Sequence, residues 1–269
     1  MRMTTNFSRA VDLRELPLCS TYLSTHIEAL LVHERQPGSP QGLSVHWGLG
    51  ALADGQLDIL GVWLELGGVD MFWRGVFGDL KVRGVGTMRF VAGVDPAIIG
   101  SSLFASYPRT LAVTSIGCFV RRIEADLTET DRVAADCMLR ALRAAGTVQD
   151  VRAALADLAA SPLGGKYPAA VTRWEAELER LRPLYALTPR LRRIISRAED
   201  AAHRLDQRLH QALDGHTCFN DGEAAASFVA ETLMRAESDL GSLAASSGKS
   251  IVRRGSKGLA RPSPSITGH

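Results

Sequence analysis

Hydrophobic and polar positions alternate along the first part of the chain in the way that extended strands require. Three runs with this pattern cover residues 21–35, 43–54 and 56–66, and alternation between two faces is typical of β-strands. The dipeptide Asp54-Gly55 separates the second and third runs and favours a short hairpin loop. We therefore expect a three-stranded antiparallel meander at the start of the fold.

The spacing of apolar residues then alternates between helical and strand-like segments. We expect in turn a helix, a strand, a helix, a strand and a helix, at residues 67–84, 87–93, 95–108, 110–115 and 118–127. Gly84 is placed to end the first of these helices. Asp95 is a suitable N-cap and Pro96 a suitable first residue for the second. This order favours a mixed sheet with helices packed on it.

From residue 128 onward the composition becomes rich in alanine and laced with charges, which predicts an all-helical region. We interpret residues 1–127 as the first part of an α/β (α+β) core, 128–185 as a helical insertion, and 186–240 as helices that complete the core. Residues 241–269 contain Gly, Ser and Pro with scattered Lys and Arg and no acidic residue. This composition predicts a disordered basic tail.

Composition narrows the class of protein only partly. With 269 residues, 46% of them hydrophobic, the chain can bury a large core. A net charge of +2 is too mild to identify a nucleic-acid binder, because clustering of Lys and Arg matters more than their sum. The four cysteines form no Cys-x-x-Cys pair, and no signal peptide or long apolar run is present. We expect a cytoplasmic protein with no membrane partner.

Three separate strings resemble one known family. They are "QLDILGVWLELGGVDMFWRGVFGDLKVRGV", "GGKYPAAVTRWEAELERLRPLYALTPRLRRII" and "FNDGEAAASFVAETLMRAE", and each is similar to a block of the bacterial Mutator-type insertion-sequence transposases, in the same order. The resemblance implies an RNase H-like mixed sheet interrupted by a helical insertion. It also implies DNA cleavage and strand transfer by two Mg²⁺ or Mn²⁺ ions, which two Asp and one Glu of the family hold.

The first two family positions can be compared directly with this sequence. Glu28 falls where the first Asp belongs, so it is the expected metal ligand and catalytic carboxylate. Gly93 falls where the second Asp belongs, so that carboxylate is missing. Asp95 lies two residues later and could replace it only if the loop shifted its register. We favour the interpretation of Asp95 as a helix N-cap.

The third family position, a Glu on a helix, is also altered. One alignment places His203 there and the other places Ala202, whereas Glu199 and Asp206 lie about one turn away on either side. We interpret these two acids as ion-pair partners on a solvated, arginine-rich helix, with a rearranged carboxylate set as the alternative. A Cys-x-x-His pair of the family is here Cys118 followed by Arg121. We expect Cys118 to act as a small buried hydrophobic residue.

These departures predict a degenerate, inactive transposase, with Mg²⁺ or Mn²⁺ as cofactor only if activity survives. The alternative is a non-catalytic protein that binds DNA, forms a homo-oligomer, or pairs with an intact transposase. DNA partners would be transposon ends and target DNA. Arg190, Arg192, Arg193 and Arg197 could contact the DNA backbone, or could lie on a solvated face beside acidic neighbours. Since only about two dozen residues precede Glu28, we expect terminal-repeat recognition to be absent or supplied by another chain.

Overall fold

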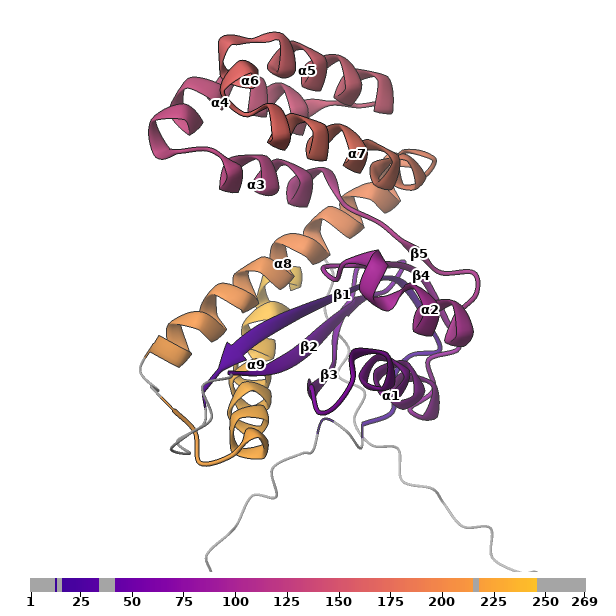
Figure 1. Cartoon of the computed structure of the whole chain (residues 1–269). Helices are drawn as coiled ribbons and strands as arrows, with labels where there is room; N and C mark the ends of the chain where they lie inside the picture. Colours follow the sequence, from indigo (N-terminus) through magenta and orange to yellow (C-terminus); the bar gives the residue numbers. More distant parts are fainter. Residues whose placement is uncertain (1–12, 14–15, 34–41, 215–217, 246–269) are drawn as a thin grey trace, which may run out of the picture.

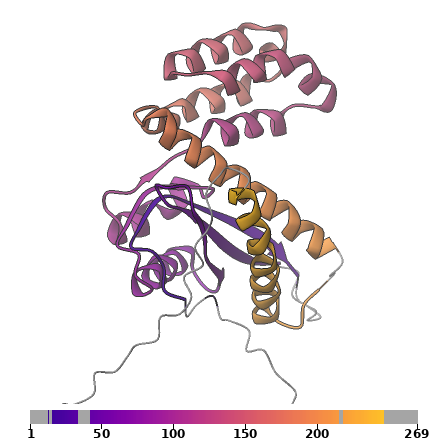
Figure 2. The ribbon, with the colours of Figure 1, turned by 180° about the vertical axis from the view of Figure 1, so that it is seen from behind.

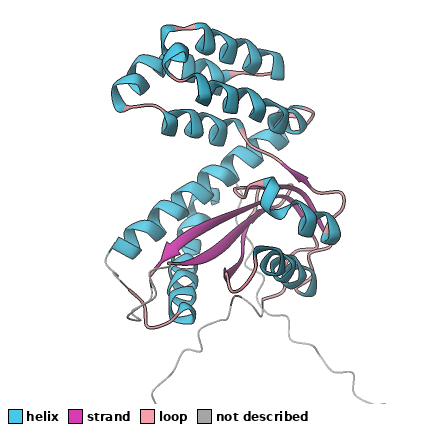
Figure 3. Cartoon of the chain, in the orientation of Figure 1, coloured by secondary structure: helices cyan, strands magenta, loops and turns pink. Residues whose placement is uncertain are grey.

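The computed structural model describes residues 13, 16–33, 42–214 and 218–245. The described residues form a mixed α/β fold around a five-stranded sheet in the order β3-β2-β1-β4-β5 (Figures 1 and 3). Strand β2 runs antiparallel to both of its neighbours, whereas β1, β4 and β5 are parallel to one another. The strands are β1 Thr21–Val32, β2 Leu43–Ala51, β3 Leu57–Leu64, β4 Thr87–Ala92 and β5 Leu111–Ala112.

Helices cover both faces of this sheet and build a separate layer beside it. Helices α1 and α2 cover one face, and α8 and α9 cover the other, while α3 to α7 stack together at one end of the molecule (Figures 1 and 2). The helices of the described residues are α1 Val69–Val82, α2 Pro96–Ser106, α3 Ile116–Asp126, α4 Glu129–Ala144, α5 Val148–Ala160, α6 Pro162–Lys166, α7 Pro168–Tyr185, α8 Pro189–Asp214 and α9 Gly222–Ala245. None of them is long and apolar enough to span a bilayer.

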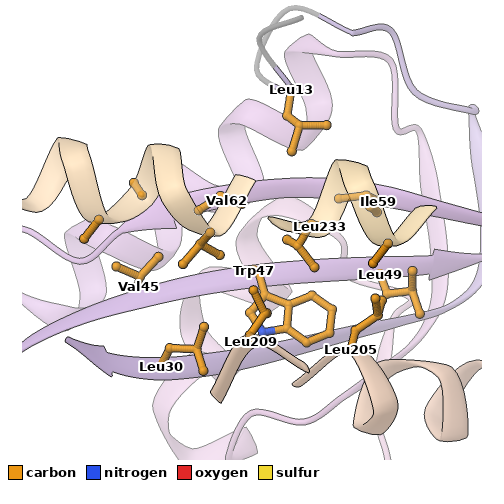
Figure 4. Close-up of a cluster of buried hydrophobic side chains, with 14 of the residues drawn as sticks. Leu13, Leu30, Val45, Trp47, Leu49, Ile59, Val62, Leu205, Leu209 and Leu233 are labelled. Carbon is orange, nitrogen blue, oxygen red and sulfur yellow. The ribbon is translucent and has the colours of Figure 1, made fainter. Parts of the chain in front are cut away.

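The hydrophobic core follows the two faces of the sheet. On one face Trp47 of β2 packs against Leu205 and Leu209 of α8 and lies in the same cluster as Leu233 of α9 (Figure 4). On the other face α1 and α2 bury an aromatic and aliphatic cluster that includes Trp73. Burying apolar area of this kind is the main stabilising contribution to a fold. The α8 side of the sheet is therefore fixed by packing along the length of that helix.

The helical layer has a hydrophobic core of its own. Residues of α4 to α7, all within the predicted insertion, cluster with Phe119 and Ile123 of α3. Helix α3 thus packs with the insertion, although it precedes residue 128 in the sequence. Helix α8 then connects this layer to the sheet, because it starts beside α7 and runs across the sheet face (Figure 1). One rigid element therefore spans both parts of the fold.

Local signals in the sequence place several boundaries correctly. The Asp54-Gly55 hairpin is confirmed, with Gly55 at φ +96°, and Gly84 at φ +105° follows the end of α1. Both glycines occupy the left-handed region, which a residue without Cβ adopts easily. The predicted strand at 110–115 contains only two ladder residues: the amide of Val113 still donates to the carbonyl of Val91 on β4, but the amide of Thr114 donates to the carbonyl of Arg180. Helix α9 runs to Ala245, five residues into the predicted tail, and the remainder of that tail lies outside the described residues.

Candidate functional site

A narrow pocket lies where β1, the loop after β4, α3 and α8 meet. Its volume is about 20 Å³, which is room for about one water molecule. The parallel register pairs His26 of β1 with Ala92, the last residue of β4, so the loop that follows β4 begins beside the middle of β1. His26 and Glu28 are two positions apart and share a face of the sheet. The polar residues that line the pocket are His26, Glu28, Thr114, Cys118, Arg121, Arg122, Arg180 and Glu199.

Glu28 carries a carboxylate that the fold keeps mostly out of water. Burial, followed by the negative charge of Asp206, raises the pKa of Glu28 to about 7, and the positive charge of Arg121 opposes part of the rise. Charged groups are disfavoured in a low-dielectric environment unless an opposite charge compensates them. Glu28 is therefore only partly ionised at neutral pH.

Glu199 forms the predicted ion pair, with Arg121, but its carboxylate is buried, so the predicted solvated setting is wrong. It is 6% exposed, and one of its oxygens accepts from the guanidinium of Arg121 on α3. Its other oxygen, Oε2, is buried and finds no donor among the described residues. Burial raises the pKa of Glu199 to about 7, although Arg121 lowers it. The helical period explains the burial, since Glu199 follows Ile195 and Ala198 on the inward face of α8.

Asp206 lies seven residues further along α8, on the same side as Glu199, and is half-buried. Burial raises its pKa, and His210 opposes the rise from 3.4 Å away, a contact that is an ion pair only when the imidazole is protonated. The indole N–H of Trp47 also lowers the pKa of Asp206, although it makes no hydrogen bond of good geometry within the described chain. Asp206 does not line the pocket, and it acts on Glu28 through its charge.

The two positions aligned with the family's Glu have other roles. Ala202 is 1% exposed and belongs to the hydrophobic core. His203 is partly exposed, and its ring nitrogen contacts the side-chain amide of Gln207 at 3.2 Å. Neither residue brings a carboxylate to the pocket. The acids that do approach Glu28 are the two that lie one turn away on either side.

Gly93 holds a conformation that no carboxylate-bearing residue could share without movement of the chain. Its φ is +95°, and a Cβ built on it would lie 2.1 Å from the carbonyl oxygen of Ile27 and 3.1 Å from Oε1 of Glu28. A contact of 2.1 Å with backbone cannot be relieved by a rotamer change. An Asp at this position would require the loop between β4 and α2 to change its path.

Asp95 caps α2, as its sequence context predicts. Its carboxylate accepts from the backbone N–H of Ala97 at 2.9 Å, and its side chain is 54% exposed and lies 3.9 Å from the guanidinium of Arg180. Asp95 does not line the pocket. The structure therefore leaves Asp95 at the surface and does not unite it with Glu28.

The residues contributed by α3 make the pocket cationic on one side. Arg121 reaches Glu199, and Arg122 pairs with Glu177 of α7. Burial raises the pKa of Cys118 to about 11, so its thiol stays neutral, although the residue is half-buried in the pocket wall and not fully buried as predicted. Burial, followed by the charge of Arg121, lowers the pKa of His26 to about 4. The pocket thus holds a neutral His26 and a neutral Cys118 beside two arginines.

The four predicted DNA-binding arginines fall into two groups. Arg190, Arg193 and Arg197 are exposed on α8. Arg192 instead lies over the ring of Tyr185 at 5.0 Å and donates to the carbonyl of Gly146 at 2.8 Å. Sequence reasoning missed two further exposed arginines, Arg204 and Arg208. Their spacing of four, and of seven from Arg197, was the signal that they share a face of the helix.

Fold and pocket together define a mixed α/β protein with a carboxylate and arginine cluster beside the sheet, crossed by a long basic helix. The chain belongs to the Mutator family of transposases, because the family model described as "Transposase, Mutator family" matches residues 2–240. It is 32% identical over 217 residues to a transposase for insertion sequence element ISRM3 of Rhizobium meliloti (strain 1021), which covers 79% of this chain and 52% of the relative.

Two other relatives carry similar names. A probable transposase for an ISRM3-like element of Sinorhizobium fredii (strain NBRC 101917 / NGR234) shows the same identity over the same shares of the two chains. A probable insertion-sequence transposase of Corynebacterium diphtheriae is 30% identical over 63% of this chain and 49% of its own length. The chain spans about half the length of the curated relatives that it matches.

The metal ions that the family's chemistry uses do not fit the pocket as it is arranged. Among the described residues, no three His, Cys, Asp or Glu side chains lie close enough together to share a metal ion. Mg²⁺ requires near-octahedral oxygen ligands at short distance. Here one oxygen of Glu199 is taken by Arg121, and Gly93 offers no side chain. The pocket therefore holds an ion pair between Arg121 and Glu199 at the place where metal ions would need free carboxylates.

Proposed function

We propose that this chain is a degenerate insertion-sequence transposase that keeps an RNase H-like core and binds DNA but performs no two-metal cleavage or strand transfer. The sheet order β3-β2-β1-β4-β5, with β2 as its antiparallel strand, supports the RNase H-like assignment. Helices on both faces and a helical layer between β5 and α8 support the view of an interrupted core. Membership of the Mutator family supports DNA as the partner.

The ion pair between Arg121 and Glu199 is the observation that carries this proposal. A guanidinium is charged at all physiological pH values, so it acts as a fixed cation inside the pocket. A divalent ion that approached Glu28 or Glu199 would have to displace this cation or accept its repulsion. Arg121 therefore compensates part of the buried negative charge without supplying the Lewis acidity that phosphoryl transfer requires.

A second candidate function is retained catalysis by a rearranged set of carboxylates. It is favoured by one observation, namely that the charges of Asp206 and Glu199 both act on Glu28. In this alternative Arg121 would have to move away from Glu199 when metal and DNA bind. In either case we propose that the protein is cytoplasmic. We also propose that it pairs with a second copy of itself or with an intact transposase.

Metal titration of the purified chain separates the two candidates. We expect that Mg²⁺ or Mn²⁺ leaves the melting temperature unchanged and that supercoiled DNA is not nicked, because the guanidinium of Arg121 already pairs with Glu199 and repels a divalent cation. The matched variant is Glu28→Gln, which keeps the shape of the side chain and removes its charge. Metal-dependent nicking that disappears in Glu28→Gln would establish catalysis and refute the proposal.

A further inference from the structure

One face of α8 carries a row of arginines that the pocket does not use. The residues follow one another at intervals of three, four, seven and four positions, which keeps them on one side of a helix of 3.6 residues per turn. All of them are exposed. This α8 arginine stripe consists of Arg190, Arg193, Arg197, Arg204 and Arg208.

Four arginines of the stripe differ from other exposed arginines, because no carboxylate among the described residues pairs with them. Arg74, Arg140 and Arg152 each have a carboxylate within 4 Å, those of Asp70, Asp136 and Glu179. The ion pairs found among the described residues leave Arg190, Arg193, Arg197 and Arg204 without such a partner. The acid nearest in sequence to Arg197 on the exposed side, Asp200, points its carboxylate to within 4.0 Å of Arg121.

A row of arginines, four of which have no carboxylate partner among the described residues, suits an anionic partner. From Arg190 to Arg208 the stripe extends about 27 Å at 1.5 Å per residue. Phosphates along one strand of duplex DNA repeat every 3.4 Å or so, so a stripe of this length faces about eight of them. Forked guanidinium donors match phosphate oxygens. The stripe therefore fits a linear polyanion better than a single anion.

The stripe and the carboxylate pocket lie on opposite sides of α8. Glu199 and Asp206 lie on the inward side of α8, roughly half a turn around the helix from Arg197 and Arg204 at 100° per residue. We propose that the α8 arginine stripe binds the nucleic-acid backbone, at a surface that is distinct from the pocket and independent of metal. This inference rests on the proposed DNA-binding function and names the surface that performs it.

Salt-dependent binding of a fluorescent DNA duplex by the full chain tests this proposal. The test variant is Arg190→Gln/Arg193→Gln/Arg197→Gln, and the control is Arg74→Gln/Arg140→Gln/Arg152→Gln, which loses the same charge at exposed positions elsewhere. Anisotropy is measured between about 50 and 200 mM salt in EDTA. We expect the slope of log Kobs against log salt to fall by about 0.9 per stripe arginine removed, with the control slope unchanged.

Each outcome decides the question. Equal weakening by both triple variants would show that net charge alone drives binding, which overturns the stripe and leaves the proposed DNA binding intact. A wild-type chain that binds no duplex overturns both. Displacement of the duplex by polyglutamate at equal charge concentration would assign the stripe to an acidic protein and overturn the nucleic-acid partner. Melting temperatures of both variants confirm that they are folded, since exposed substitutions change stability little.

Discussion

Two glutamates share one arginine in the pocket, and this ratio limits the charge that the fold keeps buried. Arg121 contacts Glu199 directly and acts on Glu28 through its charge. Because burial raises the pKa of both glutamates to about 7, the folded chain holds protons that the unfolded chain releases near pH 4.5. A buried pair that lacks full compensation costs stability when it ionises.

The pH dependence of stability follows from these shifts. Between pH 4.5 and 7 the folded state binds more protons than the unfolded state, so the free energy of unfolding falls as pH rises through this window. His26 acts in the opposite direction between pH 4 and 6.5, since its pKa is lowered to about 4 and only the unfolded chain takes up the proton. Removing one glutamate at a time is therefore needed to isolate its effect.

Glu28→Gln should abolish one part of this pH dependence. Relative to wild type, we expect the variant to gain about 2 kcal/mol of stability between pH 5 and pH 8, at about 1.4 kcal/mol per unit of pKa shift. Urea unfolding at several pH values measures this difference. Glu175→Gln, at an exposed position of α7, is the matched control. Parallel profiles for wild type and Glu28→Gln would contradict the buried-carboxylate account.

At the scale of the element, α2 shows how one side chain can end a loop and begin a helix. Asp95 accepts the N–H of Ala97, and the helix starts at Pro96, whose missing N–H needs no partner at this position. This capping arrangement uses the carboxylate that a shifted loop would otherwise have to offer to a metal. The N-cap role and the metal-ligand role are thus alternatives for the same side chain.

The two roles predict different effects of substitution at this position. Asp95→Ala should cost about 1 kcal/mol of stability, as is usual when an N-cap is lost, whereas Asp95→Asn should stay close to wild type because Asn also caps helices. Urea unfolding compares the two variants. If Asp95→Asn proved as destabilising as Asp95→Ala, the charge would matter more than the cap.

Turn and cap residues made several element boundaries predictable from the sequence. The arrangement of the pocket was harder to predict, because it depends on contacts between residues that are distant in the sequence. The Asp54-Gly55 hairpin, the end of α1 at Gly84 and the cap at Asp95 are each decided within a few residues. The surroundings of Glu199 are not, because its partner Arg121 comes from α3, which is distant in the sequence. The regular spacing of Ile195, Ala198 and Ala202 around Glu199 was the signal available in the sequence.

At the scale of the whole molecule, a small number of contacts hold the helical layer against α8. Arg192 stacks on Tyr185 of α7 and donates to Gly146, between α4 and α5. A cavity of about 260 Å³ lies at this junction and is lined by both side chains. Arg192 therefore connects α8 to the end of α7 and to the loop between α4 and α5, three segments that are separate in the sequence. We call this set of contacts the Arg192 clamp.

Substitution of neighbouring arginines tests this clamp. Arg192→Gln should lower stability by about 1–2 kcal/mol, through loss of a charged hydrogen bond and a cation–π contact, and should speed hydrogen exchange between α4 and α5. Arg193→Gln, one residue later and exposed, should change stability by less than about 0.5 kcal/mol. Equal losses in the two variants would argue against a structural role specific to Arg192.

The left-handed backbone at Gly93 limits which residues this position can accept. Because a side chain there would collide with the backbone of β1, a mutation to Asp would arrive in a loop already shaped around glycine. Such a mutation would destabilise the fold unless the loop changed its path first. The order of mutations would therefore matter at this position, since a loop change must precede any new side chain.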